Sequence, residues 1–481
     1  MDMGLETQSL KAYFLPYLTP SHMIPLADIA MLFAARGADA TIFATPHNAL
    51  FFQKSVDSAV ASGHRVAVHI LDFPSKEVGL PEGVENFSSA GSIEMAGKVF
   101  RGFMMLRQSM ERMIREFPPD CLVADAYCFW ASDLAAELQI PRISFRGNAF
   151  FALCAADSIS RHAPHERVQS DDEPFVVPNV PGEVRMTRSE LPDWVRIPNG
   201  YADFMNKAAE SDLKCDGVVV SSFYELESEF ADHYRSVLGR KAWALGPLFL
   251  KSKKNTSTDP RHICLSWLDS QKPNSVLHVS FGSLSCFSST QLQEMAMALE
   301  SSGKPFIWVV RKDDVLRESE WLPEGYEERV KENNRGMIIR DWAPQTLILE
   351  HQAIGGFMTH CGWNSVVESV IAGVPMIAWP LSADHFYNAK LVIQVLRIGV
   401  EVGVEQWSQL IQESKEFVSK EKIEKAVGGL MGGGEEAEEM RRRAKELGEL
   451  GKKAVDVGGS SYNDLTDLLA HIKSCKQKRE K

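Results

Sequence analysis

The sequence predicts an α/β protein made of two doubly wound parallel-sheet domains that face each other. Three observations lead to this prediction. The chain of 481 residues is long for one hydrophobic core. Short apolar runs alternate with helical patterns from one end to the other, which is typical of parallel sheets with crossover helices. The alternation stops at KSKKNTSTDP (251–260), a polar segment that is typical of a linker between domains.

The first half, residues 1–248, is predicted to form one domain. Its predicted strands lie at 11–18, 40–44, 66–71, 121–124, 142–145 and 217–221. Its helical patterns lie at 25–36, 96–116 and 131–138. Two stretches with few periodic signals, 75–95 and 159–200, are expected to be irregular and to contribute to ligand binding.

The second half resumes the alternation after a predicted linker at 249–262. The second domain, residues 263–455, has predicted strands at 276–280, 306–310, 337–340, 355–358 and 375–379 and helices at 290–301 and 364–372. The glycine-rich run at 431–445 lacks the preceding strand of a phosphate loop, so we expect a turn before a charged helix. The last segment, 456–481, holds a helix that could belong to either domain or pack back on the first, and a basic tail.

Composition and charge exclude several classes of protein. A formal net charge of −12 does not suit sequence-independent binding of nucleic acid, which needs a basic surface. The eight cysteines include no CxxC pair, so their spacing does not indicate a zinc site, and we expect free thiols in a reducing compartment. Residues 1–20 lack the pattern of a signal peptide, and no apolar stretch reaches about 18 residues, so we expect a cytoplasmic protein without a membrane span.

Unusual residues follow four predicted strands of the second half. Ligands of open parallel sheets bind beyond the carboxyl ends of the strands, so these residues indicate a site. Trp342 offers a flat face on which a base could stack. The candidates are Ser283 after the strand at 276–280, Trp342, Ala343 and Gln345 after 337–340, His360, Gly362, Trp363, Asn364 and Ser365 after 355–358, and Asp384 and His385 after 375–379.

The turn after the strand at 355–358 is the most informative of the four. A tight turn at Gly362, with Asn364 and Ser365 opening a helix, would aim free backbone N–H groups at an anion. His360 is placed to donate to a phosphate oxygen, and Glu368, one helical turn after Ser365, suits a ribose diol. Singly, these residues could be helix caps or core residues. Together they indicate a nucleoside diphosphate ligand.

A candidate base lies in the first half. His22 follows the strand at 11–18 and precedes a helix, whose positive end disfavours an imidazolium, so we expect a neutral ring that can accept a proton. Asp125 follows the strand at 121–124. If the two strands are near neighbours, the Asp125 carboxylate can bond the far ring nitrogen of His22 and stabilise the imidazolium that forms in a reaction. The alternatives are a packed histidine and a helix-capping aspartate.

The stretch from Trp342 to His385, WAPQTLILEHQAIGGFMTHCGWNSVVESVIAGVPMIAWPLSADH, closely resembles the 44-residue signature box of plant natural-product UDP-glycosyltransferases. The similarity extends along nearly the whole chain, from PSHMIP to the C-terminal helix. The resemblance implies the GT-B fold, in which two Rossmann-like domains face each other and the C-terminal domain binds a UDP-sugar. It implies that Trp342 stacks on uracil, that the Ala343 backbone and Gln345 contact base and ribose, and that Glu368 binds the ribose hydroxyls. It also implies that the diphosphate is held by Ser283, His360, Asn364 and Ser365. The sugar would be lined by Trp363, Asp384 and His385.

The resemblance also implies that His22 is the catalytic base and Asp125 its supporting aspartate, although the family more often has glycine where Ser21 stands. His22 would deprotonate an acceptor hydroxyl, which attacks the anomeric carbon in one inverting displacement and gives a β-O-glycoside. No Asp-any-Asp motif for a divalent metal is found in the sequence. We therefore expect no metal and no other cofactor, with the UDP-sugar as co-substrate.

The donor sugar and the acceptor stay open on sequence alone. Most members that resemble this chain end the box in glutamine and use UDP-glucose, whereas histidine, as at position 385, resembles some members that transfer galactose. We rank the two hexoses equally, above pentoses and glucuronic acid. The similarity, including TRSELPDWV at 187–195, is closest to members that act on triterpenoids, steroids or flavonoids. Phe145, Phe150 and Phe151 could line an apolar acceptor pocket or belong to the core.

Two other classes of function are weighed against this one. A receptor or carrier for small molecules could keep the fold without catalysis, but the presence of both His22 and Asp125 argues against it. An oxidoreductase that uses a dinucleotide is disfavoured because neither half has a GxGxxG after its first strand. The expected partners are a UDP-sugar and a small lipophilic acceptor, and we expect a monomer.

Overall fold

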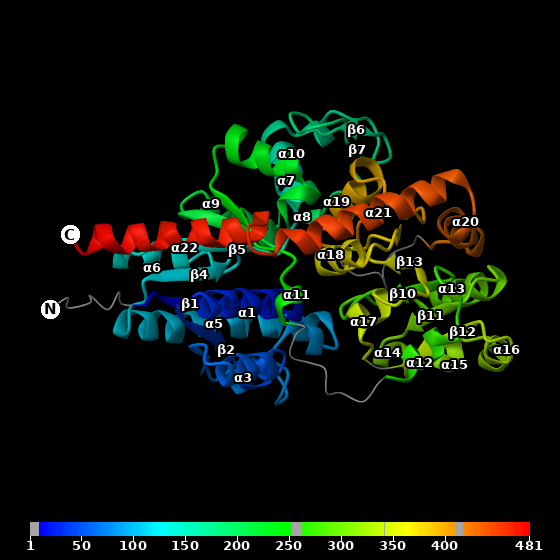
Figure 1. The fold of residues 1–481 in the computed structure, drawn as a ribbon, viewed down its shortest axis with the longest axis horizontal. Helices are drawn as coiled ribbons and strands as arrows, with labels where there is room; N and C mark the ends of the chain where they lie inside the picture. Colours follow the sequence, from blue (N-terminus) through cyan, green and yellow to red (C-terminus); the bar gives the residue numbers. More distant parts are fainter. Residues whose placement is uncertain (1–8, 198, 253–261, 341, 409–416) are drawn as a thin grey trace.

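Two parallel sheets form the framework of the protein and lie in adjoining halves of the molecule (Figure 1). The computed structural model describes residues 9–197, 199–252, 262–340, 342–408 and 417–481. The predicted fold class, with two facing α/β domains, is confirmed. Every strand pairing within the two sheets is parallel, as the strand–helix alternation predicts.

The first sheet has seven strands. In sheet order these are β3 (Val66–Ile70), β2 (Asp39–Ala44), β1 (Lys11–Leu15), β4 (Cys121–Asp125), β5 (Arg142–Arg146), β8 (Gly217–Val220) and β9 (Ala242–Ala244). Its helices are α1 (Pro20–Ala35), α2 (Pro46–Ala49), α3 (Gln53–Ala61), α4 (Ser75–Val78), α5 (Ile93–Glu116), α6 (Ala131–Leu138), α7 (Phe150–His162), α8 (Asp193–Arg196), α9 (Gly200–Asp212), α10 (Ser228–Asp232) and α11 (Phe249–Ser252). Helices α1 and α3 pack on one face of the sheet, and α5 and α6 pack on the other.

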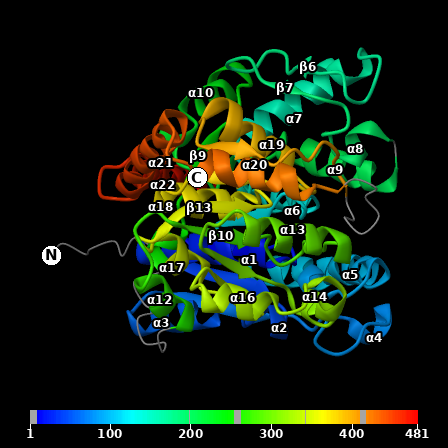
Figure 2. The same cartoon turned by 90° about the vertical axis from the view of Figure 1, so that its right-hand side faces the viewer.

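The second sheet has six strands, and helices lie on both sides of it (Figure 2). In sheet order these are β12 (Gly336–Ile339), β11 (Phe306–Val309), β10 (Val276–Ser280), β13 (Ile354–Thr359), β14 (Met376–Ala378) and β15 (Gly399–Glu401). Its helices are α12 (Ile263–Asp269), α13 (Ser289–Ser301), α14 (Lys312–Val315), α15 (Glu318–Trp321), α16 (Tyr326–Glu332), α17 (Gln345–Leu349), α18 (Trp363–Ala372), α19 (His385–Lys390), α20 (Lys420–Met431) and α21 (Glu435–Ala454).

The predicted strands all form, and the differences from prediction are local. The strands β9 and β15 were missed because three residues are too few to show an alternation. The stretch at 159–200 contains a small antiparallel hairpin, β6 (Phe175–Val176) and β7 (Arg185–Met186). The helix expected at 25–36 begins earlier, at Pro20, since proline is favoured in the first turn of a helix.

A single apolar cluster joins the two domains. It contains Phe151 and Phe223 of the first domain and Phe357 and Val366 of the second, all almost fully buried. The predicted linker at 249–262 lies mostly outside the described residues. As expected, a turn at 432–434 precedes a charged helix, α21.

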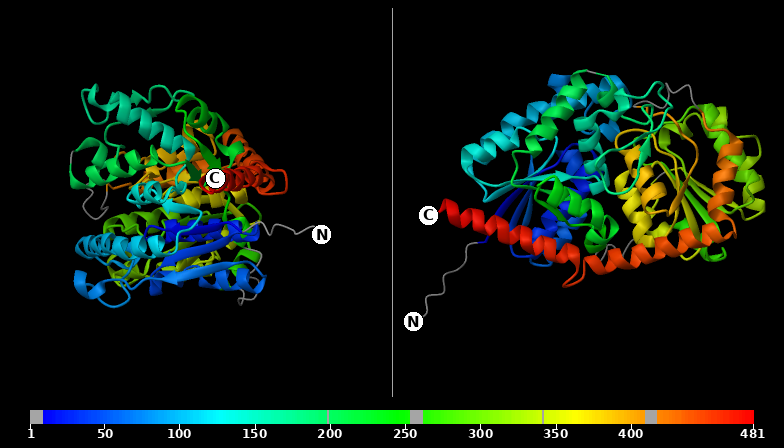
Figure 3. Two further views of the ribbon diagram at one scale, coloured as in Figure 1. Left: turned by 90° about the vertical axis from the view of Figure 1, so that its left-hand side faces the viewer. Right: turned by 90° about the horizontal axis from the view of Figure 1, so that it is seen from above.

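The last helix, α22 (Ser460–Arg479), crosses back to the first domain. Figure 3 shows α21 and α22 running one after the other along one side of the molecule. Residues Leu465, Leu468, Leu469 and Ile472 pack into the core between α1 and the first sheet. The Asp464 carboxylate accepts a hydrogen bond from the backbone N–H of Ala244 at 2.6 Å. Helix α22 is therefore structurally part of the first domain.

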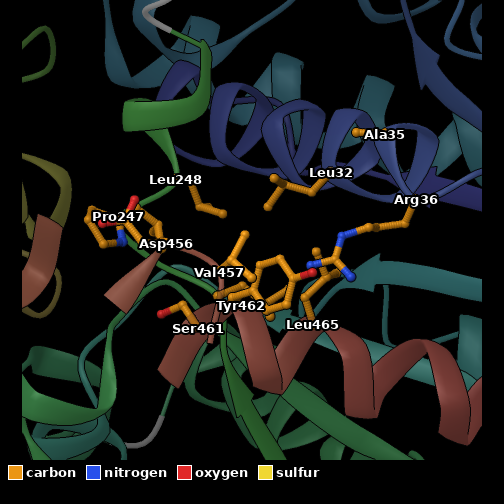
Figure 4. A pocket seen from close by; sticks show the side chains of 12 residues that line it. Leu32, Ala35, Arg36, Pro247, Leu248, Asp456, Val457, Ser461, Tyr462 and Leu465 are labelled. Atoms are coloured by element: carbon orange, nitrogen blue, oxygen red, sulfur yellow. The ribbon is translucent and has the colours of Figure 1, made fainter. Parts of the chain in front are cut away.

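The two places where the chain passes from one domain to the other lie next to each other. A pocket of about 260 Å³ is lined by α1, by residues 245–248, where the chain leaves the first domain, and by the junction of α21 and α22, where it returns (Figure 4). Among the described residues, no helix combines the length and the apolar character that crossing a membrane requires.

Candidate active site

His22 and Asp125 meet at the carboxyl edge of the first sheet. His22 lies in the first turn of α1, and Asp125 is the last residue of β4. Their strands are direct neighbours, since Leu15 of β1 pairs with Ala124 of β4. The Nδ1 atom of His22 lies 2.6 Å from Oδ2 of Asp125, so the hydrogen bond that the sequence predicts is present.

The surroundings of Asp125 fix its orientation. The carboxylate is buried, and its Oδ1 atom accepts a hydrogen bond from the backbone N–H of Tyr127 at 3.0 Å. His22 itself keeps 24% of its side chain exposed. With Nδ1 held by Asp125, the other ring nitrogen, Nε2, is left to act as a base.

The protonation of His22 differs from the expectation. Burial lowers its pKa, but the negative charge and the hydrogen bond of Asp125, together with the charge of Asp384, outweigh burial and raise the pKa above its usual value. The positive end of the helix was expected to lower the pKa and keep the ring neutral, but the pKa is shifted in the opposite direction. A carboxylate in direct contact affects the imidazole more strongly than the partial charge of a helix end.

A row of aromatic rings leads away from His22. The ring of Tyr17 lies 5.7 Å from His22 and 4.7 Å from Tyr127. Phe204 stacks on Tyr127 at 5.5 Å and on Tyr201 at 5.9 Å. Tyr201, on α9, is 37% exposed, so the row ends at the surface.

The phenylalanines singled out from the sequence are almost fully buried. Phe150 and Phe151 belong to the core, which is one of the two alternatives left open for them. Phe145 is also buried in a core cluster, but its ring lies 6.5 Å from that of His22.

The donor segment, the stretch from Trp342 to His385 that the sequence predicts to bind a UDP-sugar, has His360 near its middle, directly after β13. Its ring packs between two glycines: a Cβ atom on Gly282 would lie 2.8 Å from Cε1 of His360, and one on Gly362 would collide with Nε2. The residue with left-handed backbone in this turn is Cys361, with φ of 62°, and not Gly362, which has φ of −59°. The predicted tight turn is therefore present, but Gly362 serves to make room for the imidazole.

The amino end of α18 is open to a ligand. No side chain caps its first turn. Ser365 and Glu368 lie on its partly exposed face, and the Gln345 amide donates to both, at 3.2 Å to Oγ of Ser365 and at 2.7 Å to Oε2 of Glu368. The Asn364 amide donates to the backbone oxygen of Ser21 at 3.1 Å, which places this helix end beside the start of α1.

Trp363 has a different role from the one expected. Its ring is 3% exposed, and its Nε1–H donates to the backbone oxygen of Ser221 in the first domain at 2.7 Å. The indole N–H of Trp363 is therefore already used in a contact between the domains. The side chain packs the two domains together.

The residues that follow β10 and β12 are placed at the surface. Trp342 is 73% exposed, which is unusual for a large aromatic ring. Ser283 is exposed, and Ala343 is half-buried. Three of the four strands, β10, β13 and β14, are adjacent in the sheet, whereas β11 separates β12 from β10. The start of α17 nevertheless brings Gln345 against α18.

Asp384 and His385 lie at the start of α19. Burial raises the pKa of Asp384, and its Oδ2 atom accepts a hydrogen bond from the Asn148 amide of the first domain at 2.7 Å. The rings of His385 and His360 meet edge to face at 4.7 Å. Burial lowers the pKa of His360 to about 4 and that of His385 well below its usual value. Both rings are therefore neutral at physiological pH and can donate a hydrogen bond without carrying a charge.

Sequence reasoning missed several residues of this site. Asn148 follows β5 at the carboxyl edge of the first sheet, and that position is the signal that could have identified it. Ser221, which follows β8, was overlooked for the same reason. Tyr17 and Tyr127, which lie beside the base, carry no motif.

Comparison with known proteins identifies the family. A family model described as UDP-glucoronosyl and UDP-glucosyl transferase matches residues 252–416. UDP-glucosyl transferase 73CC6 of Saponaria officinalis is 47% identical over 478 residues, covering 96% of this chain and 96% of that protein. The soyasapogenol B glucuronide galactosyltransferase of Glycine max is 44% identical over 488 residues, covering 99% of this chain and 98% of that protein.

A solved structure agrees with these relatives. The crystal structure of UGT73P12 of Glycyrrhiza uralensis, complexed with glycyrrhetinic acid 3-O-monoglucuronide, matches with a TM-score of 0.92 at 43% identity, covering 98% of this chain and 97% of that chain. Likeness at this level over almost the full length goes beyond a shared fold. The chain therefore belongs to the plant natural-product UDP-glycosyltransferases, a family of transferases with the GT-B fold.

Proposed function

We propose that this enzyme transfers glucose or galactose from a UDP-sugar to a hydroxyl group of a lipophilic plant natural product of triterpenoid, steroid or flavonoid type. The transfer inverts the anomeric configuration, gives a β-O-glycoside and needs no metal ion. The observation that carries the proposal is the hydrogen bond between Asn364 and Ser21, which holds the open end of α18 beside the His22–Asp125 pair.

The acceptor hydroxyl loses its proton to Nε2 of His22, while Asp125 stabilises the imidazolium that forms. The acceptor oxygen bonds to the anomeric carbon as the bond from that carbon to the diphosphate breaks. UDP leaves with the bonding electron pair. The free N–H groups of α18 and a hydrogen bond from neutral His360 stabilise the negative charge on the diphosphate.

We infer the contacts of the donor site from the resemblance of Trp342–His385 to the signature box of the family. Trp342 stacks on uracil, Ala343 contacts it through the backbone, and Gln345 and Glu368 bind the ribose. Ser283, His360, Asn364, Ser365 and the N–H groups after Gly362 hold the diphosphate. Asp384 and His385 bind the sugar hydroxyls, and Trp363 contributes its backbone alone.

The aromatic row beside His22 supports the proposed acceptor class. Tyr17, Tyr127, Phe204 and Tyr201 form a continuous row of rings, and aromatic rings suit a rigid polycyclic lipophile. Relatives are named for soyasapogenol B glucuronide, anthocyanin and scopoletin as acceptors, and this range of polycyclic molecules supports the same class.

Turnover should depend on His22. We expect His22→Ala to lower kcat by about 10²–10⁴-fold, because the general base is lost, while UDP still binds. The measurement is glycoside formation by mass spectrometry and UDP release, with UDP-glucose and UDP-galactose against a panel of acceptors. His64→Ala, at the far edge of the first sheet, is the matched control. Undiminished turnover would reject the mechanism, and binding without turnover in the wild-type protein would indicate a receptor or carrier.

The pH dependence of kcat/KM should report His22. Only the neutral ring accepts a proton, so activity is lost as the pH falls through the pKa of His22. Since that pKa is raised, the acidic limb should have its midpoint above pH 6.5, the usual value for histidine. Asp125→Asn removes the charge that raises the pKa and leaves burial in place, so the midpoint should move to lower pH and kcat should fall. Asp133→Asn, at an exposed position of α6, is the control; an unmoved limb in Asp125→Asn would assign the titration to another group.

Donor choice should respond to His385. The backbone N–H of Ser382 donates to Nδ1 of His385 at 3.2 Å, so the proton lies on Nε2 and the ring offers only a donor to the sugar. Glutamine offers both a donor and an acceptor. We expect His385→Gln to shift the ratio of kcat/KM for UDP-galactose and UDP-glucose toward glucose by about 10-fold, the equivalent of one hydrogen bond. Equal ratios in both proteins would remove position 385 from donor selection.

Asn148 should support donor use from the opposite domain. Its amide holds the Asp384 carboxylate, and a hydrogen bond to a charged group contributes about 1.5–3 kcal/mol. We expect Asn148→Ala to lower kcat/KM for the UDP-sugar by about 10–100-fold in initial-rate measurements. Asn179→Ala, in an outer loop of the same domain, is the control. A change confined to the acceptor KM would contradict this role.

A further inference from the structure

A second cluster of reactive side chains lies at the opposite edge of the first sheet. His471 and Cys475 are one turn apart on α22, and Nε2 of His471 lies 3.8 Å from Sγ of Cys475. Asp216 directly precedes β8, at the amino edge of the sheet. One ligand atom from each of these three residues lies within 4.8 Å of the other two.

These separations are close to those of a metal site. Zn²⁺ binds thiolate sulfur at about 2.3 Å and imidazole nitrogen at about 2.0–2.1 Å, so two such ligands of a tetrahedral ion lie about 3.6 Å apart. The sulfur–nitrogen distance of 3.8 Å already fits this geometry. The Asp216 carboxylate is exposed and needs to approach by only about 1 Å. Water would complete the tetrahedron.

Neighbouring groups hold two of the three side chains, Asp216 and His471, in place. The backbone N–H of Arg142 donates to Oδ2 of Asp216 at 3.0 Å, which orients the carboxylate and leaves Oδ1 for an ion. The ring of His471 packs against Trp243 of β9 at 5.6 Å. The ligands therefore come from ordered elements rather than from a loose surface.

Two lysines face the cluster and have to be accommodated. Nζ of Lys241 lies 3.5 Å from Nδ1 of His471, and Lys478 lies on the same helix as Cys475. Ligation through Nε2 requires a proton on Nδ1, which removes the acceptor of Lys241, and this exposed side chain can turn to solvent. Burial and the charge of Asp216 raise the pKa of Cys475, so an ion has to displace the thiol proton.

We propose that Asp216, His471 and Cys475 form a binding site for a borderline-soft divalent cation such as Zn²⁺, which fastens α22 to the first sheet. The site takes no part in sugar transfer. It lies at the amino edge of the sheet that carries His22 and Asp125 at its carboxyl edge. Sequence spacing does not reveal it, because the cysteines form no pair and Asp216 is distant in the sequence.

Titration of the full-length protein with Co²⁺ tests the site. We expect one equivalent to bind with a thiolate-to-cobalt charge-transfer band, release of a proton and displacement by Zn²⁺. Cys475→Ser should abolish the band, and His471→Ala and Asp216→Asn should each weaken binding by at least about 10–100-fold. Cys215→Ser, which changes the thiol next to Asp216, is the matched control and should keep the band.

Thermal unfolding supplies a second measurement. Zn²⁺ should raise the Tm of the wild-type protein and of Cys215→Ser, and leave the Tm of Cys475→Ser unchanged, because an ion that binds only the folded state stabilises it. The replacement of sulfur by oxygen at a half-buried position keeps the fold, which circular dichroism verifies. Equal Co²⁺ binding by the wild-type protein and Cys475→Ser, or the absence of a thiolate band, would overturn the proposal. Sugar transfer should be the same with and without the ion.

Discussion

The apposition of two sheet edges is the constraint on which the chemistry of this protein depends. The proposed base lies on one domain and the predicted donor segment on the other, so the proposed reaction needs both domains. Side-chain hydrogen bonds cross from the donor segment to the first domain at Ser21 and Ser221, and the Asn148 amide reaches across in the opposite direction. A buried apolar cluster behind these bonds makes the arrangement rigid. Orientation of this kind is a large part of what an enzyme contributes to a two-substrate reaction.

Charged and neutral groups have different roles at the junction of the two domains. Asp125 makes His22 a stronger base and also reduces the fraction of enzyme in which the ring is free to accept a proton. The histidines of the donor segment are kept neutral by burial. In the proposed reaction, the N–H groups of α18 and these neutral rings therefore face the diphosphate.

Sequence reasoning predicted the fold class and most of the parallel strands, because such strands leave periodic and local patterns. It also predicted the contact between His22 and Asp125, on the condition that β1 and β4 are neighbours, and they are. It could not predict the place of Trp363, because the indole donates its hydrogen bond to a residue of the other domain, Ser221. The predicted direction of the shift in the His22 pKa was wrong. Burial and the Asp125 carboxylate have opposite effects on this pKa, and which of them is larger depends on distances that only the fold provides.

The return of α22 to the first domain has a consequence for how the chain is made. The apolar face that Leu468 and Ile472 cover stays bare until the ribosome has translated the entire second domain. Part of the core of the nascent first domain therefore stays exposed to water until α22 has been synthesised. A gene fragment that stops before α22 would encode a protein whose first domain lacks the helix that covers this part of its core.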